Sequence, residues 1–170
     1  MKSTFLTAAA IAALATPGFA QDWTGPYAGF GVGQADVDGP GAQDGDDTSY
    51  GLHVGYDYDF GDWVVGGELE YNWADVDLAG GANTDAFSRL KFKAGYDFGP
   101  ALGYVVAGAS RANTSLGDDS GVVYGLGVAY AISDSMTLSG ELLRDDFSDF
   151  NNSGSDLTSD TFNIRASFRF

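Results

Sequence analysis

Apolar and polar residues alternate along most of the chain with a period of two, the spacing of a β-strand whose two faces differ. The clearest run covers 49–60, where every second residue from Tyr50 to Phe60 is apolar and the residues between them include His53 and Asp57. Seven further segments alternate in the same way, strongly or weakly: 26–36, 63–73, 89–98, 101–112, 122–132, 136–146 and 161–170. The pattern predicts eight strands.

Two kinds of connection alternate between these strands. Short turns with glycine, proline or aspartate stand at three places, 60–63, 98–101 and 133–135. Longer polar segments rich in glycine or aspartate stand at the other four, near 37–48, 75–85, 113–120 and 147–160. An even number of strands with short turns at one end and long loops at the other is typical of a transmembrane barrel. We therefore predict an all-β fold, an eight-stranded antiparallel up-and-down transmembrane β-barrel with both termini in the periplasm.

A soluble barrel of lipocalin type would show the same alternation, with its apolar face turned inward. The size of the side chains argues against it. The apolar face carries many aromatic rings, and the interior of an eight-stranded barrel has little room for them. The opposite face is rich in small residues such as Gly51, Gly55 and Gly125, which suit a crowded interior. The aromatic face is therefore predicted to point toward lipid, with rings near the strand ends forming two interfacial belts.

The first twenty residues have the features of a cleavable signal peptide. Lys2 supplies positive charge, an apolar core runs from Phe5 to Ala15, and small residues at Gly18 and Ala20 suit a cleavage site. We therefore expect a signal peptide over 1–20 and an exported barrel domain over 21–170.

Composition narrows the functional classes. Eight Lys and Arg against 24 Asp and Glu give a formal net charge of −16, which argues against nucleic-acid binding. The absence of cysteine excludes disulfides, thiolate zinc sites and cysteine nucleophiles. The mean hydropathy is −0.09 and no run of 18 apolar residues occurs, so no transmembrane helix is expected.

Both ends of the predicted barrel carry family features. The first strand opens with Trp-Thr-Gly-Pro-Tyr-Ala-Gly over 23–29, and an amphipathic strand from Phe162 closes the chain at Phe170. With the leader, these features resemble the small eight-stranded outer-membrane proteins of the opacity-protein and OmpA-like barrel group, porin-family surface proteins of Gram-negative bacteria. The resemblance implies location in the outer membrane and contact with its lipid and lipopolysaccharide. It also implies that Phe168 and Phe170 form the assembly signal for the outer-membrane insertion machinery. Because the chain stops with the eighth strand, we expect no peptidoglycan-binding domain.

Charged residues on the inward face of the predicted strands should pair with one another. The chain reverses in the predicted loop near 75–85, which places Glu70 opposite Arg89 or Lys91, and Glu68 opposite Lys91 or Lys93. On the last two predicted strands, Glu141 faces the region of Arg165. Isolated charges in a low-dielectric interior are costly, so pairing is expected. This predicts a salt-bridged lumen that is plugged; the alternative is a narrow porin-like channel for ions or small solutes. The basic residues predicted to point inward are Arg89, Lys91, Lys93, Arg111, Arg165 and Arg169.

Catalytic chemistry has little support in the sequence. His53 is the single histidine, and it shares its inward strand face only with Ser49 and Asp57. A histidine that is hydrogen-bonded inside the lumen is favoured over a general base. We predict no enzyme activity, no catalytic residues, no organic cofactor and no defined metal site.

The four long loops are acidic and contain no lysine or arginine near their aspartates. A solvated, self-repelling rim is the simplest interpretation. Carboxylate oxygens also suit Ca²⁺ or Mg²⁺, so weak binding of divalent cations is a second possibility. The sequence thus favours a structural role with surface loops available for cell-surface interaction.

Overall fold

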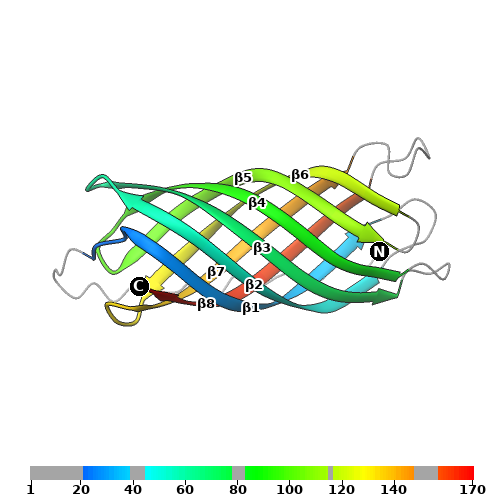
Figure 1. The fold of residues 1–170 in the computed structure, drawn as a ribbon, viewed down its shortest axis with the longest axis horizontal. Helices are drawn as coiled ribbons and strands as arrows, with labels where there is room; N and C mark the ends of the chain where they lie inside the picture. The colour runs from blue at the N-terminus through cyan, green and yellow to red at the C-terminus, as the bar shows by residue number, and fades with distance from the viewer. Residues whose placement is uncertain (1–20, 39–44, 78–82, 115–116, 148–156) are drawn as a thin grey trace, which may run out of the picture.

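The computed structural model is a closed barrel in which each strand pairs with its neighbours in chain order and β1 pairs with β8 (Figure 1). The structure describes residues 21–38, 45–77, 83–114, 117–147 and 157–170. All eight pairings are antiparallel, which confirms the predicted fold class. The strands are β1 (Gly25–Asp38), β2 (Gly45–Asp59), β3 (Trp63–Asp77), β4 (Asn83–Asp97), β5 (Ala101–Thr114), β6 (Gly117–Ala131), β7 (Met136–Phe147) and β8 (Leu157–Arg169).

The short turns gather at one end of the barrel. The Phe60 N–H donates to the Trp63 carbonyl at 2.7 Å, and Gly61 between them has φ of 99°. Residues with a side chain rarely adopt this backbone conformation, so the turn favours glycine at this position. The described N-terminal segment and the C-terminus lie at the same end, where the Phe170 N–H donates to the Pro26 carbonyl at 3.1 Å (Figure 1).

The strands run further than the apolar alternation predicts. β2 begins at Gly45, β4 at Asn83 and β8 at Leu157, within segments expected to be loops. Pairing continues because ladder hydrogen bonds satisfy the backbone whatever the side chains are. The remaining parts of the predicted loops, and the predicted signal peptide with them, fall outside the described residues: 1–20, 39–44, 78–82, 115–116 and 148–156.

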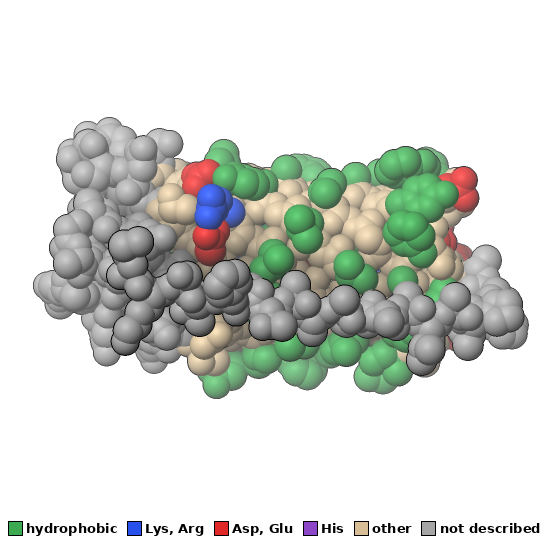
Figure 2. Space-filling view, turned by 180° about the vertical axis from the view of Figure 1, so that it is seen from behind, with side chains coloured by type: hydrophobic (Ala, Val, Ile, Leu, Met, Phe, Trp, Pro, Cys, Tyr) green, Lys and Arg blue, Asp and Glu red, His purple; other side chains and the backbone are tan. Residues whose placement is uncertain are grey.

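Apolar side chains cover the outer wall, as predicted. Figure 2 shows them spread along the barrel on the side that it presents. Every aromatic residue assigned to the outward face is exposed, from Tyr96 at 39% to Phe170 at 76%. No helix among the described residues is long and apolar enough to cross a membrane.

A few large rings point inward, each accommodated by small residues. Tyr27 and Tyr104 are buried inside the barrel. A Cβ added at Gly127 would lie 2.4 Å from Cζ of the Tyr104 ring, and one added at Gly55 would lie 2.4 Å from Cζ of Tyr27. Glycine on the inward face therefore provides the space that these rings occupy.

Candidate functional site

The register of β3 against β4 determines which charges face each other inside the barrel. Glu68 lies opposite Lys91 and Glu70 lies opposite Arg89. All four side chains are almost completely buried. Since both strands keep the two-residue period through this stretch, the charged positions on each strand point into the lumen together.

Lys91 is the centre of a buried ion-pair network. Its Nζ lies 2.9 Å from Glu68 Oε1 and 2.6 Å from Glu141 Oε1, and it also donates to Glu70 Oε2. The Lys91 side chain is 1% exposed. A single ammonium thus joins three carboxylates from β3 and β7.

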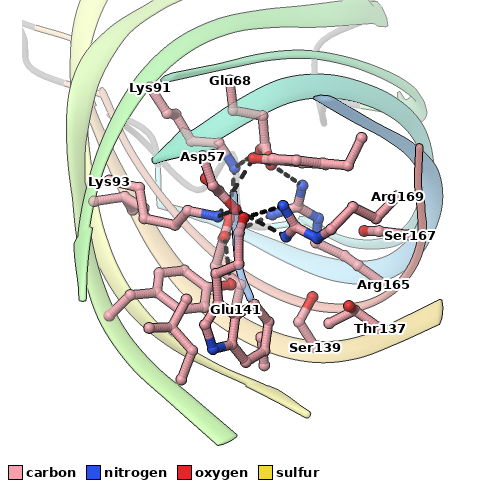
Figure 3. A pocket seen from close by; sticks show the side chains of 16 residues that line it. Asp57, Glu68, Lys91, Lys93, Thr137, Ser139, Glu141, Arg165, Ser167 and Arg169 are labelled. Carbon is pink, nitrogen blue, oxygen red and sulfur yellow. Dashed lines mark hydrogen bonds and ion pairs between the residues drawn. The ribbon is translucent and has the colours of Figure 1, made fainter. Parts of the chain in front are cut away.

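Arg165 on β8 closes the network from the opposite wall (Figure 3). Its two terminal nitrogens lie 2.5 Å from Glu68 Oε2 and 2.7 Å from Glu141 Oε2. The same two carboxylates also accept hydrogen bonds from tyrosine hydroxyls: Tyr27 donates to Glu68 at 2.9 Å and Tyr104 donates to Glu141 at 3.0 Å. Residues from six of the eight strands therefore meet across the interior at this level.

A second group of ion pairs lies on the side nearer the long loops. Arg89 binds Glu70 at 2.8 Å and donates from Nε and Nη2 to both oxygens of Asp145, at 3.1 and 2.6 Å. The guanidinium also stacks 5.5 Å from the centre of the Phe87 ring. Asp145 is completely buried, although its sequence position directly precedes the acidic fourth loop. The alternation on β7 could have located it, because Glu141 and Asp145 are four residues apart on one face.

A third group closes the mouth at the short-turn end of the barrel. Of the two residues expected opposite Glu68, Lys91 takes that position, and Lys93 lies opposite Gly66 and binds Asp57 Oδ2 at 2.9 Å. Arg169, the last residue of β8, binds the same Asp57 oxygen at 3.1 Å. Asp57 therefore binds two cations, one from β4 and one from β8.

Trp23 fills the mouth beside this group. It is 1% exposed and belongs to an apolar cluster with Val64 of β3 and Leu102 of β5, across the opening from β1. Arg169 donates to the Trp23 carbonyl and places its guanidinium 5.7 Å from the centre of the indole ring. The sequence analysis used Trp23 only as a family feature, because no local pattern indicates that it turns into the lumen.

The charges of the whole network balance. It has five cations and five carboxylates, each in at least one ion pair: Arg89, Lys91, Lys93, Arg165 and Arg169, with Asp57, Glu68, Glu70, Glu141 and Asp145. The large negative charge of the chain is therefore located outside this network. A balanced, mutually bonded set of charges is what a low-dielectric interior tolerates.

Two arginines lie on the outer wall instead. The prediction that Arg111 points inward is wrong: it is exposed, because Ser110 next to it on β5 takes the inward position. Arg144 on β7 is also exposed and binds both oxygens of Asp160, at 2.6 and 2.5 Å. This pair also corrects the expectation that no basic residue offsets the aspartates of the fourth loop.

The interior has little free space where the charges meet. A cavity of about 30 Å³ is lined by network residues, among them Lys91 and Arg165, and by Trp23, Ser139 and Ser167. This is space for very few water molecules. Nearer the long loops, the buried hydroxyls of Ser110, Ser159 and Thr161 have no hydrogen-bond partner within the described structure.

His53 lies inside the barrel wall and is 2% exposed. Its Nε2 is 2.8 Å from the Ser167 hydroxyl, and its ring lies 6.1 Å from that of Tyr27. Within the described ranges, no three His, Cys, Asp or Glu side chains are grouped so that they could hold a metal ion. Among the aspartates of the acidic loops considered for divalent cations, Asp44, Asp149 and Asp156 fall outside those ranges.

Comparison with known proteins identifies relatives of both the sequence and the fold. The profile of the outer membrane protein beta-barrel domain family matches residues 4–170. A 25 kDa outer-membrane immunogenic protein of Brucella abortus is 29% identical over 109 residues, which are 60% of this chain and 51% of that protein. The chain thus spans about half the length of this relative. The same protein of Brucella melitensis matches equally well.

Solved structures share the architecture at low sequence identity. Neisserial surface protein A is 18% identical with a TM-score of 0.65, covering 86% of this chain and 98% of its own. Ail, the attachment invasion locus protein of Yersinia pestis, solved with a heparin analogue, is 18% identical with a TM-score of 0.56 and coverages of 86% and 99%. The outer membrane enzyme PagL is 13% identical with a TM-score of 0.53, covering 79% of this chain and 97% of its own. These likenesses concern the fold.

Proposed function

The chain belongs to the outer membrane protein beta-barrel domain family, and we propose that it is an integral barrel whose lumen is plugged by the ion-pair network and whose loops serve a structural or cell-surface role. Its location is the outer membrane of a Gram-negative bacterium. The observation that carries the plug is Lys91, which is 1% exposed and bound to three carboxylates in the middle of the barrel.

The surface role is supported by where the chain places its charge. The interior network is balanced, so the excess of acidic residues lies outside it, much of it in the predicted loops. A charged, solvated rim keeps the loops in water and available to partners at the cell surface. Relatives include a surface protein and an attachment protein by name, which agrees with such a role.

A narrow channel for ions or small solutes is the second candidate. It is favoured by the unpartnered hydroxyls of Ser110, Ser159 and Thr161, because buried polar groups usually bind water when no protein group is near. In this alternative, water would enter the half of the lumen nearer the loops. Passage would still require the ion pairs around Lys91 and Arg165 to open.

We also propose that the barrel has no catalytic activity. His53 is buried and pairs with Ser167 inside the wall, so a substrate has no access to its imidazole. The carboxylates Glu68 and Glu141 each bind cations and a tyrosine hydroxyl, which leaves them poorly suited to proton transfer. We further propose that Phe168 and Phe170, at the C-terminal end of the chain, contact the insertion machinery, since both are exposed and their rings lie 5.2 Å apart.

Single cysteines test the placement of the loops, since the chain has none of its own. We expect Thr158→Cys, at the long-loop end of β8, to react with a membrane-impermeant maleimide on intact cells. Asp134→Cys, in a short exposed turn, should react only after the outer membrane is permeabilised. The opposite pattern would invert the topology and remove the surface role.

A charge on the lipid-facing wall tests the membrane placement itself. Leu126 is 56% exposed on β6 in the middle of the apolar wall. Leu126→Arg should destabilise the barrel by roughly 2–4 kcal/mol, the cost of a cation near the bilayer midplane. Urea unfolding in lipid vesicles measures this, with Leu126→Phe as the apolar control. Equal stability of the arginine variant and the parent would show that this position does not face hydrocarbon.

A further inference from the structure

The outer wall is hollowed over β2 to β6 on the half of the barrel nearer the long loops. The hollow has a volume of about 540 Å³. Its lining comes in groups of three consecutive residues from β2, β3, β4 and β5, and the middle residue of each group points into the barrel. The backbone of these middle residues therefore forms the floor, and the outward side chains on either side form the walls.

The strand register arranges the walls in two rows. The lower row is apolar and runs from Val54 through Leu69 and Leu90 to Ala109, each paired with the next across neighbouring strands. The upper row, two residues nearer the long loops on each strand, becomes polar as it crosses the barrel: Tyr71, Ser88, Arg111 and Ser120.

Small residues produce the hollow. Ser88 and Ala109 stand between larger exposed neighbours, among them Leu69, Tyr71 and Leu90. The hollow is apolar along one side and is bordered by hydroxyls and a guanidinium on the side nearer the long loops. A lipid molecule has the matching arrangement, with apolar acyl chains and a polar headgroup nearer the cell surface.

Arg111 brings a positive charge to the edge of the hollow. Among the described basic residues, five belong to the interior network, and only Arg111 and Arg144 lie on the outer wall. Arg144 is bound through two nitrogens to Asp160 and does not line the hollow. A guanidinium has five N–H donors, so Arg111 can bind a phosphate and keep a contact within the protein.

We propose that this hollow binds an anionic, phosphate-bearing lipid of the outer leaflet. One acyl chain lies along the row from Val54 to Ala109, and the headgroup phosphate lies against Arg111 with the hydroxyls of Ser88 and Ser120 beside it. The charge of Arg111 selects an anionic headgroup over a zwitterionic one. The inference depends on the membrane placement of the barrel and is independent of whether the lumen is plugged.

Lipid retention by the purified barrel in detergent tests the proposal, with dioleoyl phosphatidate and dioleoyl phosphatidylcholine as probes and native mass spectrometry as the readout. We expect one phosphatidate to be retained about tenfold more tightly than phosphatidylcholine, since charge-assisted hydrogen bonds differ by about that factor. Arg111→Gln should remove this preference, and Ala109→Trp, which fills the hollow, should abolish retention of both lipids. Arg144→Gln is the matched control and should behave as the parent.

Equal retention of the two lipids, or equal effects of Arg111→Gln and Arg144→Gln, would overturn the proposal in favour of an unselective lipid layer. A dimer that Ala109→Trp abolishes would overturn it in favour of a second copy of the chain. Neither result bears on the cysteine labelling pattern, so failure of this site is distinguishable from failure of the proposed topology.

Discussion

Replacing Lys91 by alanine is expected to destabilise the folded barrel by about 3–5 kcal/mol. The ammonium is the shared partner of Glu68, Glu70 and Glu141, and all four side chains are nearly inaccessible to solvent. Removing it leaves carboxylates in a low-dielectric interior, with Arg165 and Arg89 as their remaining cations. Urea unfolding in lipid vesicles, followed by the mobility of unheated samples on gels, measures the loss.

The matched control for Lys91 is an ion pair of similar geometry on the outside of the barrel. Arg144 and Asp160 lie as close as the buried pairs, but both side chains are about half exposed. Solvent screens such a pair, so Arg144→Ala should cost far less than Lys91→Ala. If the two variants lost similar, small amounts of stability, the lumen around Lys91 would be hydrated and the plug would be wrong.

Trp23→Ala is the second large effect expected, with a loss of roughly 3–5 kcal/mol for a fully buried indole. Trp23 joins the start of β1 to Val64 and Leu102 across the mouth, so alanine would leave a cavity that neither lipid nor neighbouring side chains can fill. The same unfolding assay measures the loss.

Trp63→Ala is the control for Trp23. Trp63 is 59% exposed on the outer wall, where lipid replaces the missing ring and no cavity forms. Its replacement should therefore cost less. A larger loss for Trp63→Ala than for Trp23→Ala would show that the mouth is not closed by packing of the indole.

The architecture was predictable from the sequence because it depends on the two-residue alternation of apolar and polar positions. Alternation over 49–60 and 63–73 specifies which face meets lipid, and the short turns at Gly61 and Gly99 specify which strands are neighbours. The pairing of Glu70 with the Arg89 region could also be anticipated, because the two strands are consecutive and antiparallel and the alternation fixes which residues of each point inward.

The features that escaped prediction depend on contacts between distant strands. Asp145 resembles its acidic neighbours in sequence and is distinguished only by the strand face that turns it toward Arg89. Arg111 was predicted to point inward with five other basic residues of the strands, whereas β5 turns it outward. Trp23 precedes the first strand, where no periodicity indicates the direction of a side chain. The ends of β2, β4 and β8 that extend into the predicted loops were also missed, because their residues do not alternate between apolar and polar.

The central claim, a lumen plugged by balanced ion pairs, is tested most directly by conductance of the purified barrel in a planar lipid bilayer. We predict no measurable steady current for the parent protein, because Lys91, Arg165 and their carboxylates occupy the middle of the lumen. A steady, ion-selective current from the parent that changes selectivity in Lys91→Ala would contradict the plug and establish the channel in its place.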